Sequence, residues 1–186
     1  MTRGLLNKIF EIFSTFFWTT LFLLKTTGVW RVKKSTIVEG RVIIRSLQGD
    51  AKFGKNLRIG SIVNLASTKG AVISIGDNVS INQGCYIICR NKITIGDNTR
   101  IGEYSSIRDN THQFSNLEIP IFEQDYSSKP VFIGNDVWIG RAVTIMPGVM
   151  IGDGAVIGSH SVVVKNVPMY AVFAGVPARE IGHRNR

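Results

Sequence analysis

The chain of 186 residues is poor in cysteine and in proline. Its two cysteines, Cys85 and Cys89, are too few for a disulfide scaffold, and their spacing is not the C-x-x-C of a zinc site. We therefore expect a reducing, cytoplasmic environment. Five prolines stand against 19 glycines, and this balance favours many tight corners over long helices.

Acidic residues are also scarce, with 13 against 22 lysines and arginines, which gives a net charge of +9. Much of the excess precedes residue 60, where the basic residues follow an apolar, aromatic stretch. This order fits an anionic membrane surface or an anionic glycan better than a nucleic-acid duplex, so we expect no nucleic-acid partner. A solvated basic face is the plain alternative.

No apolar run is long enough to span a bilayer. The uncharged segment 12–24 falls short of the roughly 20 residues required, and no small-residue cleavage site follows it. Because its apolar residues have helical spacing, we interpret residues 1–30 as a helix in the membrane interface, with residues up to 34 on the headgroups. This would place the protein peripherally at the inner face of the cytoplasmic membrane. The alternative is a helix packed on its own trimer.

A period of six residues dominates the rest of the chain. It runs without a slip through Ile133, Ile139, Ile145, Ile151, Ile157 and Val163. Four residues after each of these lies a small or β-branched residue. Strands have a period of two and helices of 3.6, so a period of six indicates a prism of short strands, with three hexapeptides to a coil.

The register of the repeat predicts the organisation of the chain. We expect about five coils within residues 53–168, interrupted by a loop at 113–130. A basic lead-in at 31–52 precedes them, and a tail at 169–186 follows. The coils begin at Phe53, Ile75, Ile95, Ile133 and Ile151.

These repeats resemble the left-handed parallel β-helix family of hexapeptide acyltransferases. The resemblance implies an all-β triangular prism with an N-terminal helix and one long loop, and it supplies the left hand, because crossovers between parallel strands are normally right-handed. The motifs RDNTHQF, IGNDVWIG and AGVPAR resemble the xenobiotic, galactoside and maltose O-acetyltransferase branch and the polysaccharide O-acetyltransferases. They imply acetyl-CoA as co-substrate, no metal, and a homotrimer.

The long loop follows directly after His112. An imidazole can take a proton from a hydroxyl near neutral pH, and the resemblance implies that His112 is the catalytic base. We expect its side chain to be exposed at the corner where the loop emerges, above a core of Ile107 and Thr111. Asp109 and Asn110 are candidates to orient the ring or to meet the acceptor, although Asp109 is equally a candidate turn residue.

The remaining site residues follow from the resemblance alone. Asn82 is a candidate for acceptor binding, and Trp138, expected at a corner, for contact near the thioester. For the CoA groove and its phosphates the resemblance implies Arg141, Ser159, His160, Lys165 and Arg179.

Three other functions are alternatives to O-acetylation. A zinc enzyme on this prism needs three histidines around one site, but His112, His160 and His183 have no short ligand spacing. A non-catalytic scaffold leaves the joint presence of His112, Trp138 and AGVPAR unexplained. N-acetylation of a nucleotide-linked amino sugar is the rival within acyl transfer. We expect O-acetylation of a glycan in a surface polysaccharide or its lipid-linked precursor, although a small-molecule hydroxyl acceptor is also open.

Overall fold

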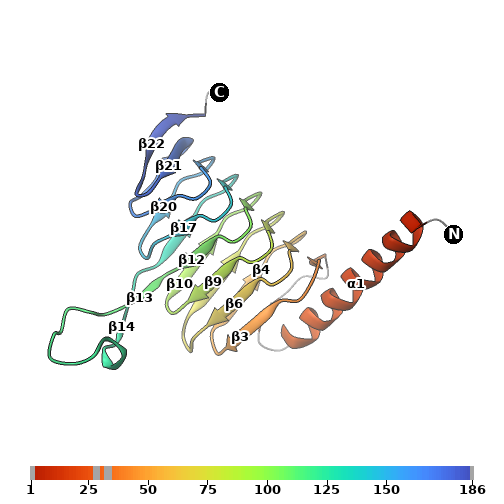
Figure 1. Cartoon of the computed structure of the whole chain (residues 1–186), viewed down its shortest axis with the longest axis horizontal. Helices are drawn as coiled ribbons and strands as arrows, with labels where there is room; N and C mark the ends of the chain where they lie inside the picture. Colours follow the sequence, from red (N-terminus) through yellow and green to blue (C-terminus); the bar gives the residue numbers. More distant parts are fainter. Residues whose placement is uncertain (1–2, 27–29, 32–34, 185–186) are drawn as a thin grey trace.

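The computed structural model describes residues 3–26, 30–31 and 35–184 as one helix followed by a three-faced β-solenoid (Figure 1). The expected N-terminal helix is α1 (Arg3–Thr26). Residues 27–29 and 32–34, part of the segment expected on headgroups, lie outside the described residues. The prism is a left-handed parallel β-helix: the repeat predicted the prism, and the family resemblance implied its left hand.

Each face of the prism is a stack of short parallel strands. The first face contains β1 (Trp30–Arg31), β4 (Asp50–Phe53), β7 (Val72–Ile75), β10 (Lys92–Ile95), β15 (Val131–Ile133) and β18 (Met150–Ile151). The second contains β2 (Ile37–Val38), β5 (Arg58–Ile59), β8 (Ser80–Ile81), β11 (Arg100–Ile101), β16 (Trp138–Ile139), β19 (Val156–Ile157) and the antiparallel hairpin of β21 (Ala171–Gly175) and β22 (Ala178–His183). The third contains β3 (Ile43–Leu47), β6 (Asn64–Ser67), β9 (Tyr86–Cys89), β12 (Ser106–Arg108), β17 (Thr144–Ile145) and β20 (Val162–Val163).

The prism has about six turns, one more than the five that the repeat predicted. Strands β1, β2 and β3 form the additional turn inside the segment expected as a lead-in. Val38 of this turn is fully buried and Ile44, six residues later, packs against the core. A single interval of six residues is too short to recognise as a repeat, so the sequence predicts one turn fewer than the structure has.

The predicted inward positions form the core. Each aliphatic residue of the unbroken series from Ile133 to Val163 has at most 1% of its surface exposed. The upstream series through Phe53, Ile75 and Ile95 is buried in the same way. Equivalent residues pair from turn to turn, as in Ile95 with Ile133, so the core is a set of aliphatic ladders along the axis. Each such burial contributes about 1.5–3 kcal/mol, and the sum stabilises a body in which each turn packs mainly on the turns next to it.

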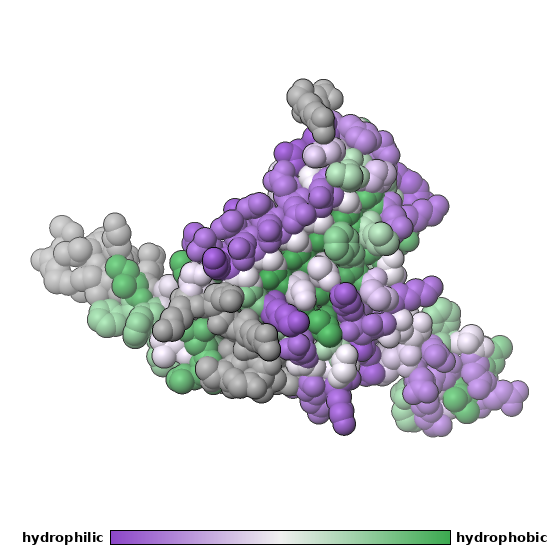
Figure 2. All heavy atoms as spheres, turned by 180° about the vertical axis from the view of Figure 1, so that it is seen from behind, coloured by the Kyte–Doolittle hydropathy of each residue, from purple (hydrophilic) through white to green (hydrophobic). Residues whose placement is uncertain are grey.

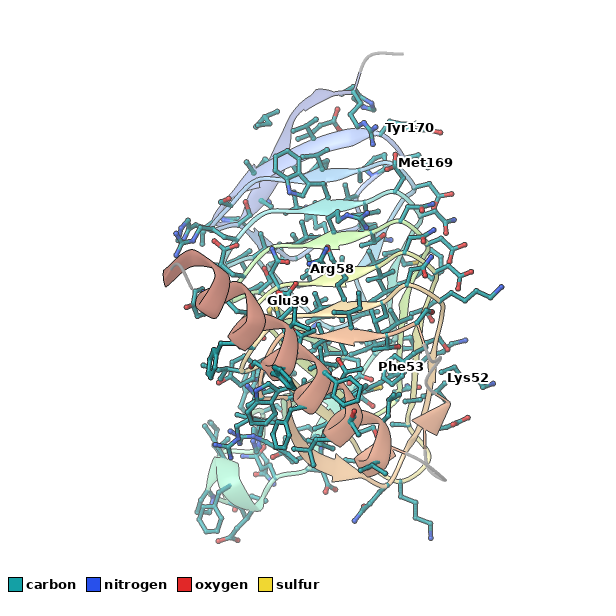
Figure 3. All side chains as sticks on the ribbon, turned by 90° about the vertical axis from the view of Figure 1, so that its right-hand side faces the viewer. Glu39, Lys52, Phe53, Arg58, Met169 and Tyr170 are labelled. Atoms are coloured by element: carbon teal, nitrogen blue, oxygen red, sulfur yellow. The ribbon has the colours of Figure 1, made fainter. Side chains whose placement is uncertain are left out.

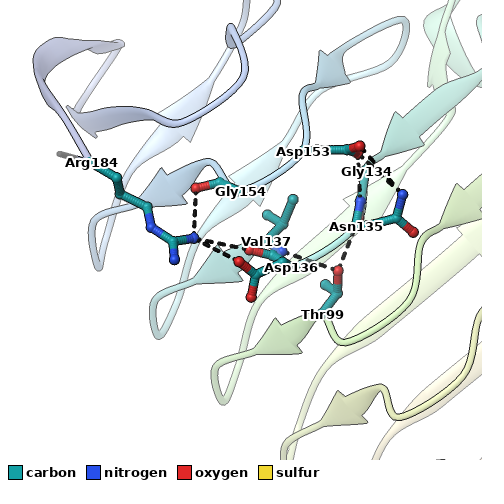
Figure 4. Close-up of polar contacts among 8 residues, drawn as sticks. All are labelled: Thr99, Gly134, Asn135, Asp136, Val137, Asp153, Gly154 and Arg184. Carbon is teal, nitrogen blue, oxygen red and sulfur yellow. Dashed lines mark hydrogen bonds and ion pairs between the residues drawn. The ribbon is translucent and has the colours of Figure 1, made fainter. Parts of the chain in front are cut away.

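The corner between the first and second faces, here called the ladder corner, is held by polar side chains that bond along the axis. Asp97 Oδ1 accepts the backbone N–H of Asp77 at 2.7 Å. In the same way, Asp153 Oδ1 accepts the backbone N–H of Asn135 at 2.7 Å (Figure 4). Asn78 Nδ2 donates to Asn98 Oδ1 at 3.1 Å. Asn78 has φ of 57°, a left-handed conformation that asparagine tolerates better than most residues. The polar residues at this corner therefore stabilise it through hydrogen bonds between adjacent turns.

The C-terminal hairpin is fastened to the same corner. Arg184 Nη1 donates to Asp136 Oδ2 at 2.9 Å and to the carbonyl of Gly154 at 3.0 Å (Figure 4). The Tyr170 ring lies over Gly154, where a Cβ atom would come within 2.4 Å of it, so only glycine fits. The predicted tail therefore closes the C-terminal end of the prism.

Helix α1 covers the N-terminal end. Phe22 is buried against Phe53, with ring centroids 6.2 Å apart, and Thr19 Oγ1 accepts the backbone N–H of Val38 at 2.9 Å. Figure 3 shows the helix lying across the edge of the prism, with Phe53 near its C-terminal half. Within one chain, α1 therefore packs on its own prism.

The opposite side of α1 exposes large hydrophobic side chains. Figure 2 shows some of this apolar surface, in green, towards the left of the view. The exposed residues are Phe10, Ile12, Phe13, Phe16, Phe17 and Leu24, and we call them the outer face of α1. In the described part of the chain no helix is long and apolar enough to cross a membrane.

Candidate active site

The corner between the third and first faces, here called the loop corner, is where the chain leaves the prism. After β12 it continues into β13 (Asn110–His112), which pairs antiparallel with β14 (Tyr126–Ser128). The intervening loop contains a short 3-10 helix at Ile121–Glu123 and projects from the prism (Figure 1). Because β13 and β14 form a ribbon, the loop has a fixed base, and the side chains at this base have defined positions.

Asp109 holds this corner from inside. It is fully buried, and its carboxyl oxygens accept the backbone N–H groups of Arg90 at 2.8 Å and Asn91 at 2.7 Å. Asn110 Nδ2 donates to the same carboxyl group at 3.0 Å. A group with no exposed surface cannot meet an acceptor, which corrects that expectation. Asp109 instead fixes the turn one coil below, in line with the turn role considered from sequence.

His112 is exposed at the base of the loop, as its position predicted. Its ring lies against Tyr126, with centroids 4.0 Å apart and planes inclined by 40°. The guanidinium carbon of Arg90 lies 3.4 Å from the centroid of the same tyrosine ring. A cation over an aromatic face is attracted by the ring's quadrupole, so Arg90, Tyr126 and His112 form one stack with limited freedom. Among the described residues, none forms a hydrogen bond or ion pair with the imidazole.

The stack forms one wall of a pocket of about 440 Å³. Apolar atoms of Ile88, Ile145, Met146 and Pro147 line the remainder, together with threonines and Arg108. This combination of an apolar surface with a few converging polar groups is typical of a small-molecule site. His112 can therefore reach a bound hydroxyl from an exposed but anchored position.

Asn110 lines the same pocket, whereas Asn82 does not. Asn110 Nδ2 also donates to the carbonyl of Ile88 at 3.3 Å, so the side chain spans two coils. Asn82 lies at the corner between the second and third faces and lines a different hollow with Arg58 and Arg100. Within one chain it is not part of the His112 pocket. Thr111, expected in the core, is exposed because β13 has already left the prism.

Three of the candidate donor residues gather at that corner between the second and third faces. Arg141, Ser159 and His160 are all exposed there. The backbone N–H of His160 donates to the carbonyl of Arg141 at 2.9 Å, which places the two residues on adjacent turns. The Arg141 side chain lies 3.5 Å from Glu103. None of these residues lines the His112 pocket.

The other donor candidates are spread over the second face and the loop corner. Trp138 lies on strand β16, with 59% of its surface exposed, and not at a corner as expected. It points outward because its neighbour Ile139 occupies the inward position. Lys165 is exposed beyond β20 at the loop corner, and Arg179 is exposed on the closing hairpin. Within one prism, His112 therefore lies apart from most of the residues expected to bind a donor.

The histidines are dispersed. His112 lies at the loop corner, His160 between the second and third faces, and His183 on β22, where Nε2 lies 3.1 Å from Glu180. Among the described residues no group of three histidine, cysteine or acidic side chains is placed to hold a metal ion.

Sequence reasoning missed Arg90, Arg108 and Tyr126. The position of Arg90 could have been predicted, because the coils repeat. Ile88 pairs with Arg108 of the next coil, so Arg90 is equivalent to Asn110 in the coil before it. Tyr126 was not recoverable, since it returns from a loop whose path has no period. The pairing of β13 with β14 is what brings it to His112.

Comparisons with known proteins decide the family. The family described as bacterial transferase hexapeptide (six repeats) matches residues 130–165. WbbJ of Escherichia coli, described as a putative lipopolysaccharide biosynthesis O-acetyl transferase, is 36% identical over 144 residues, 74% of each chain. This chain belongs to the bacterial hexapeptide transferase family. It is an acyltransferase, as the resemblance of its motifs implied.

Two further proteins are similar. Rv3034c of Mycobacterium tuberculosis, a probable acetyltransferase, is 32% identical over 133 residues, which are 72% of this chain and 44% of that protein. AntD, an N-acyltransferase from Bacillus cereus solved with dTDP and 3-hydroxybutyryl-CoA, superposes with a TM-score of 0.77. The match covers 93% of this chain and 91% of AntD at 22% identity, so it supports the fold.

Proposed function

We propose that this hexapeptide transferase moves an acetyl group from acetyl-CoA to a hydroxyl of a glycan, in a surface polysaccharide or its lipid-linked precursor. The observation that carries the proposal is His112, exposed and held by Tyr126 at the edge of a 440 Å³ pocket. The description of WbbJ as an O-acetyl transferase of lipopolysaccharide biosynthesis supports a glycan hydroxyl.

In the proposed reaction His112 acts as general base. Its imidazole accepts the hydroxyl proton while the oxygen attacks the thioester carbonyl carbon. The carbon–sulfur bond then breaks, and His112 returns the proton to the departing CoA sulfur. Asn110 is placed in the same pocket to contact the acceptor.

A covalent cysteine intermediate is disfavoured by the state of Cys89. This thiol lines the pocket, but burial and the nearby Asp109 carboxylate raise its pKa to about 12. The thiolate is the nucleophilic form, so Cys89 is protonated at physiological pH. We therefore propose that the acetyl group passes directly from acetyl-CoA to the acceptor hydroxyl.

We also propose that the active unit is a homotrimer with the donor bound between subunits. Two observations support this. One prism keeps His112 away from Arg141, Ser159 and His160. The loop exposes apolar side chains that a neighbouring prism would cover, including Leu117 at 95% and Phe122 at 79% exposure (Figure 2, lower right). A stable monomer in light scattering at micromolar concentration would contradict the proposal.

The residues expected to bind the donor fit a phosphorylated molecule. Lys165 and Arg179 are exposed cations, and Trp138 is an exposed aromatic ring. Cations of this kind recognise phosphates, and an exposed tryptophan favours a ligand or a partner.

The function is tested by a screen that follows both substrates. Purified protein with acetyl-CoA is offered matched hydroxyl and amino sugars, free, nucleotide-linked and lipid-linked. Thiol release measures turnover, and mass spectrometry with alkaline treatment separates ester from amide products. We expect alkali-labile esters. Exclusive formation of amides on amino sugars would replace the proposal with N-acylation.

We further propose that the outer face of α1 rests on the anionic inner surface of the cytoplasmic membrane. The side opposite to it packs on the prism, so the outer face is presented as a fixed apolar strip. Arg41 lies beside Trp18 and Leu21 at the edge of the helix, and Arg45 is exposed further along β3. Apolar burial combined with nearby cations is the composition that binds anionic interfaces.

Liposome sedimentation tests this contact. The double variant F13S/F16S should lose binding to vesicles with anionic lipid, while Ile181→Ser, equally exposed at the other end of the protein, should bind like the wild type. If the wild-type protein does not bind anionic vesicles, the membrane contact is contradicted, and the outer face of α1 is a surface for protein packing instead.

A further inference from the structure

Two arginines line the His112 pocket without an acidic partner. Arg90 and Arg108 are both exposed and both border the cavity. The ion pairs found among the described residues involve Arg58, Arg141, His183 and Arg184, and neither pocket arginine. The charged and titratable side chains that line the pocket are Arg90, Arg108, His112, Tyr126 and Cys89, so none is a carboxylate.

The closest carboxyl group is already engaged. Asp109 accepts two backbone N–H groups, the Asn110 amide and the Cys89 thiol, and it is fully buried. Arg90 therefore meets Asp109 through its backbone, while its guanidinium turns outward over Tyr126. Among the described residues, no carboxylate forms an ion pair with either pocket arginine.

Both guanidinium groups are held in place. Arg90 lies 3.4 Å from the Tyr126 centroid, and Arg108 lies 5.9 Å from the Tyr86 centroid while its Nε donates to Ser106 Oγ at 3.2 Å. Holding like charges near one pocket is unfavourable unless a ligand brings negative charge. A guanidinium presents paired donors that match a carboxylate or a phosphate.

We propose that Arg90 and Arg108 bind an anionic group of the acceptor, a carboxylate or phosphate carried on the sugar next to the hydroxyl that His112 deprotonates. This inference rests on the proposed function and narrows its acceptor to acidic glycans or phosphorylated sugars. The two arginines select the acceptor by charge, and His112 acts on it.

The test measures binding in the absence of a donor, so it is independent of turnover. Methyl glucuronide and glucose 1-phosphate are compared with methyl glucoside by calorimetry at low salt. We expect the anionic sugars to bind about 10-fold to 100-fold more tightly than the neutral one, the usual effect of a charged hydrogen-bonded contact. Arg90→Gln and Arg108→Gln should each remove most of this preference.

Three controls separate charge recognition from a structural role. Arg90→Lys should keep part of the preference, because it keeps the charge. Arg108→Gln leaves the contact between Tyr126 and His112 untouched, so it reports on charge without disturbing the base. Arg58→Gln removes an exposed arginine that is paired with Glu39 in another hollow, and it should leave the preference unchanged.

The inference is overturned if the neutral and anionic sugars bind alike, or if the preference survives in both glutamine variants. It is also overturned if these variants weaken the binding of CoA and leave the sugars unaffected, because the anion would then be a donor phosphate. Failure of the proposed function is a separate result, namely unchanged turnover after loss of His112.

Discussion

The ladder corner and the loop corner both carry polar side chains but use them differently. At the ladder corner, polar groups such as Asp97 and Asn78 bond to the turn next to them, and the corner is complete within one chain. At the loop corner, His112, Arg90 and Arg108 face a pocket without hydrogen-bonding or ionic partners for their charged ends in the described residues, apart from the Arg108 contact with Ser106. Polar groups satisfied along the axis stabilise the prism, whereas those left facing a cavity are available for chemistry.

The largest effect is expected from His112→Ala. Turnover should fall about 10²-fold to 10⁴-fold, the usual contribution of a general base, because His112 is the one imidazole among the described residues that line the pocket. Folding should be unchanged, since His112 is exposed. Steady-state kinetics with matched melting curves measures this. Near-normal turnover would remove His112 from the reaction.

Asp109→Ala should destabilise the protein. Two backbone N–H groups and one amide would lose their acceptor, and each buried unsatisfied group costs about 1–3 kcal/mol. Chemical denaturation gives the loss, and Asp109→Asn, which keeps one acceptor oxygen, should lie between the variant and the wild type. A stable Asp109→Ala protein that loses only acceptor affinity would show that the residue belongs to the binding surface after all.

Lys165→Ala, also at the loop corner, should raise the KM for acetyl-CoA about tenfold and leave kcat almost unchanged. A contact to a CoA phosphate, which is not a reacting group, stabilises the ground state and the transition state alike. Arg179→Ala should behave similarly. If the constants for both variants match those of the wild type, the donor lies elsewhere.

Asn78 tests the ladder corner. Asn78→Gly keeps the left-handed conformation but removes two side-chain hydrogen bonds, so we expect a loss of about 0.5–1.5 kcal/mol. Asn78→Ala should lose about 1 kcal/mol more, because φ is 57° there. Turnover should match the wild type in both. A large loss of activity would mean that the ladder corner takes part in catalysis.

The smallest effect is expected from treating the native protein with an alkylating reagent that attacks its two cysteine thiols. Burial raises the pKa of Cys85 to about 11 and, with Asp109, that of Cys89 to about 12, from an ordinary 9.0. Native protein should therefore resist iodoacetamide at pH 8, whereas the denatured chain should react fully. The native state holds these protons more tightly than the unfolded chain, so their stabilising contribution is present below pH 9 and is lost as the pH rises from there towards 12. Rapid labelling of the native protein would contradict this.

The period of six was sufficient to predict the prism, because an apolar residue recurs at the inward position of almost every hexapeptide and lets the turns stack. Ile139 and Val143 are buried where the repeat places them. The first turn was not predicted because it contains a single interval of six residues, between Val38 and Ile44. Helix α1 supplies the packing that the weak repeat does not.

The site was predicted less completely, because its geometry depends on contacts that are not periodic. The position of His112 followed from the end of a hexapeptide. The burial of Asp109 did not, since it depends on the turn at Arg90 and Asn91. Tyr126 reaches His112 only through the pairing of β13 with β14.

The central claim is that acyl transfer takes place at the loop corner. A crystal structure of the trimer with a non-hydrolysable acetyl-CoA analogue tests it most directly. A hydrogen bond of about 2.6–3.2 Å from base to hydroxyl and a reacting separation of about 3–3.5 Å place the acyl carbon within roughly 6 Å of the His112 imidazole. We predict that distance in each of three equivalent sites. An acyl group at the ladder corner, or beyond the reach of His112 from every subunit, would contradict the account.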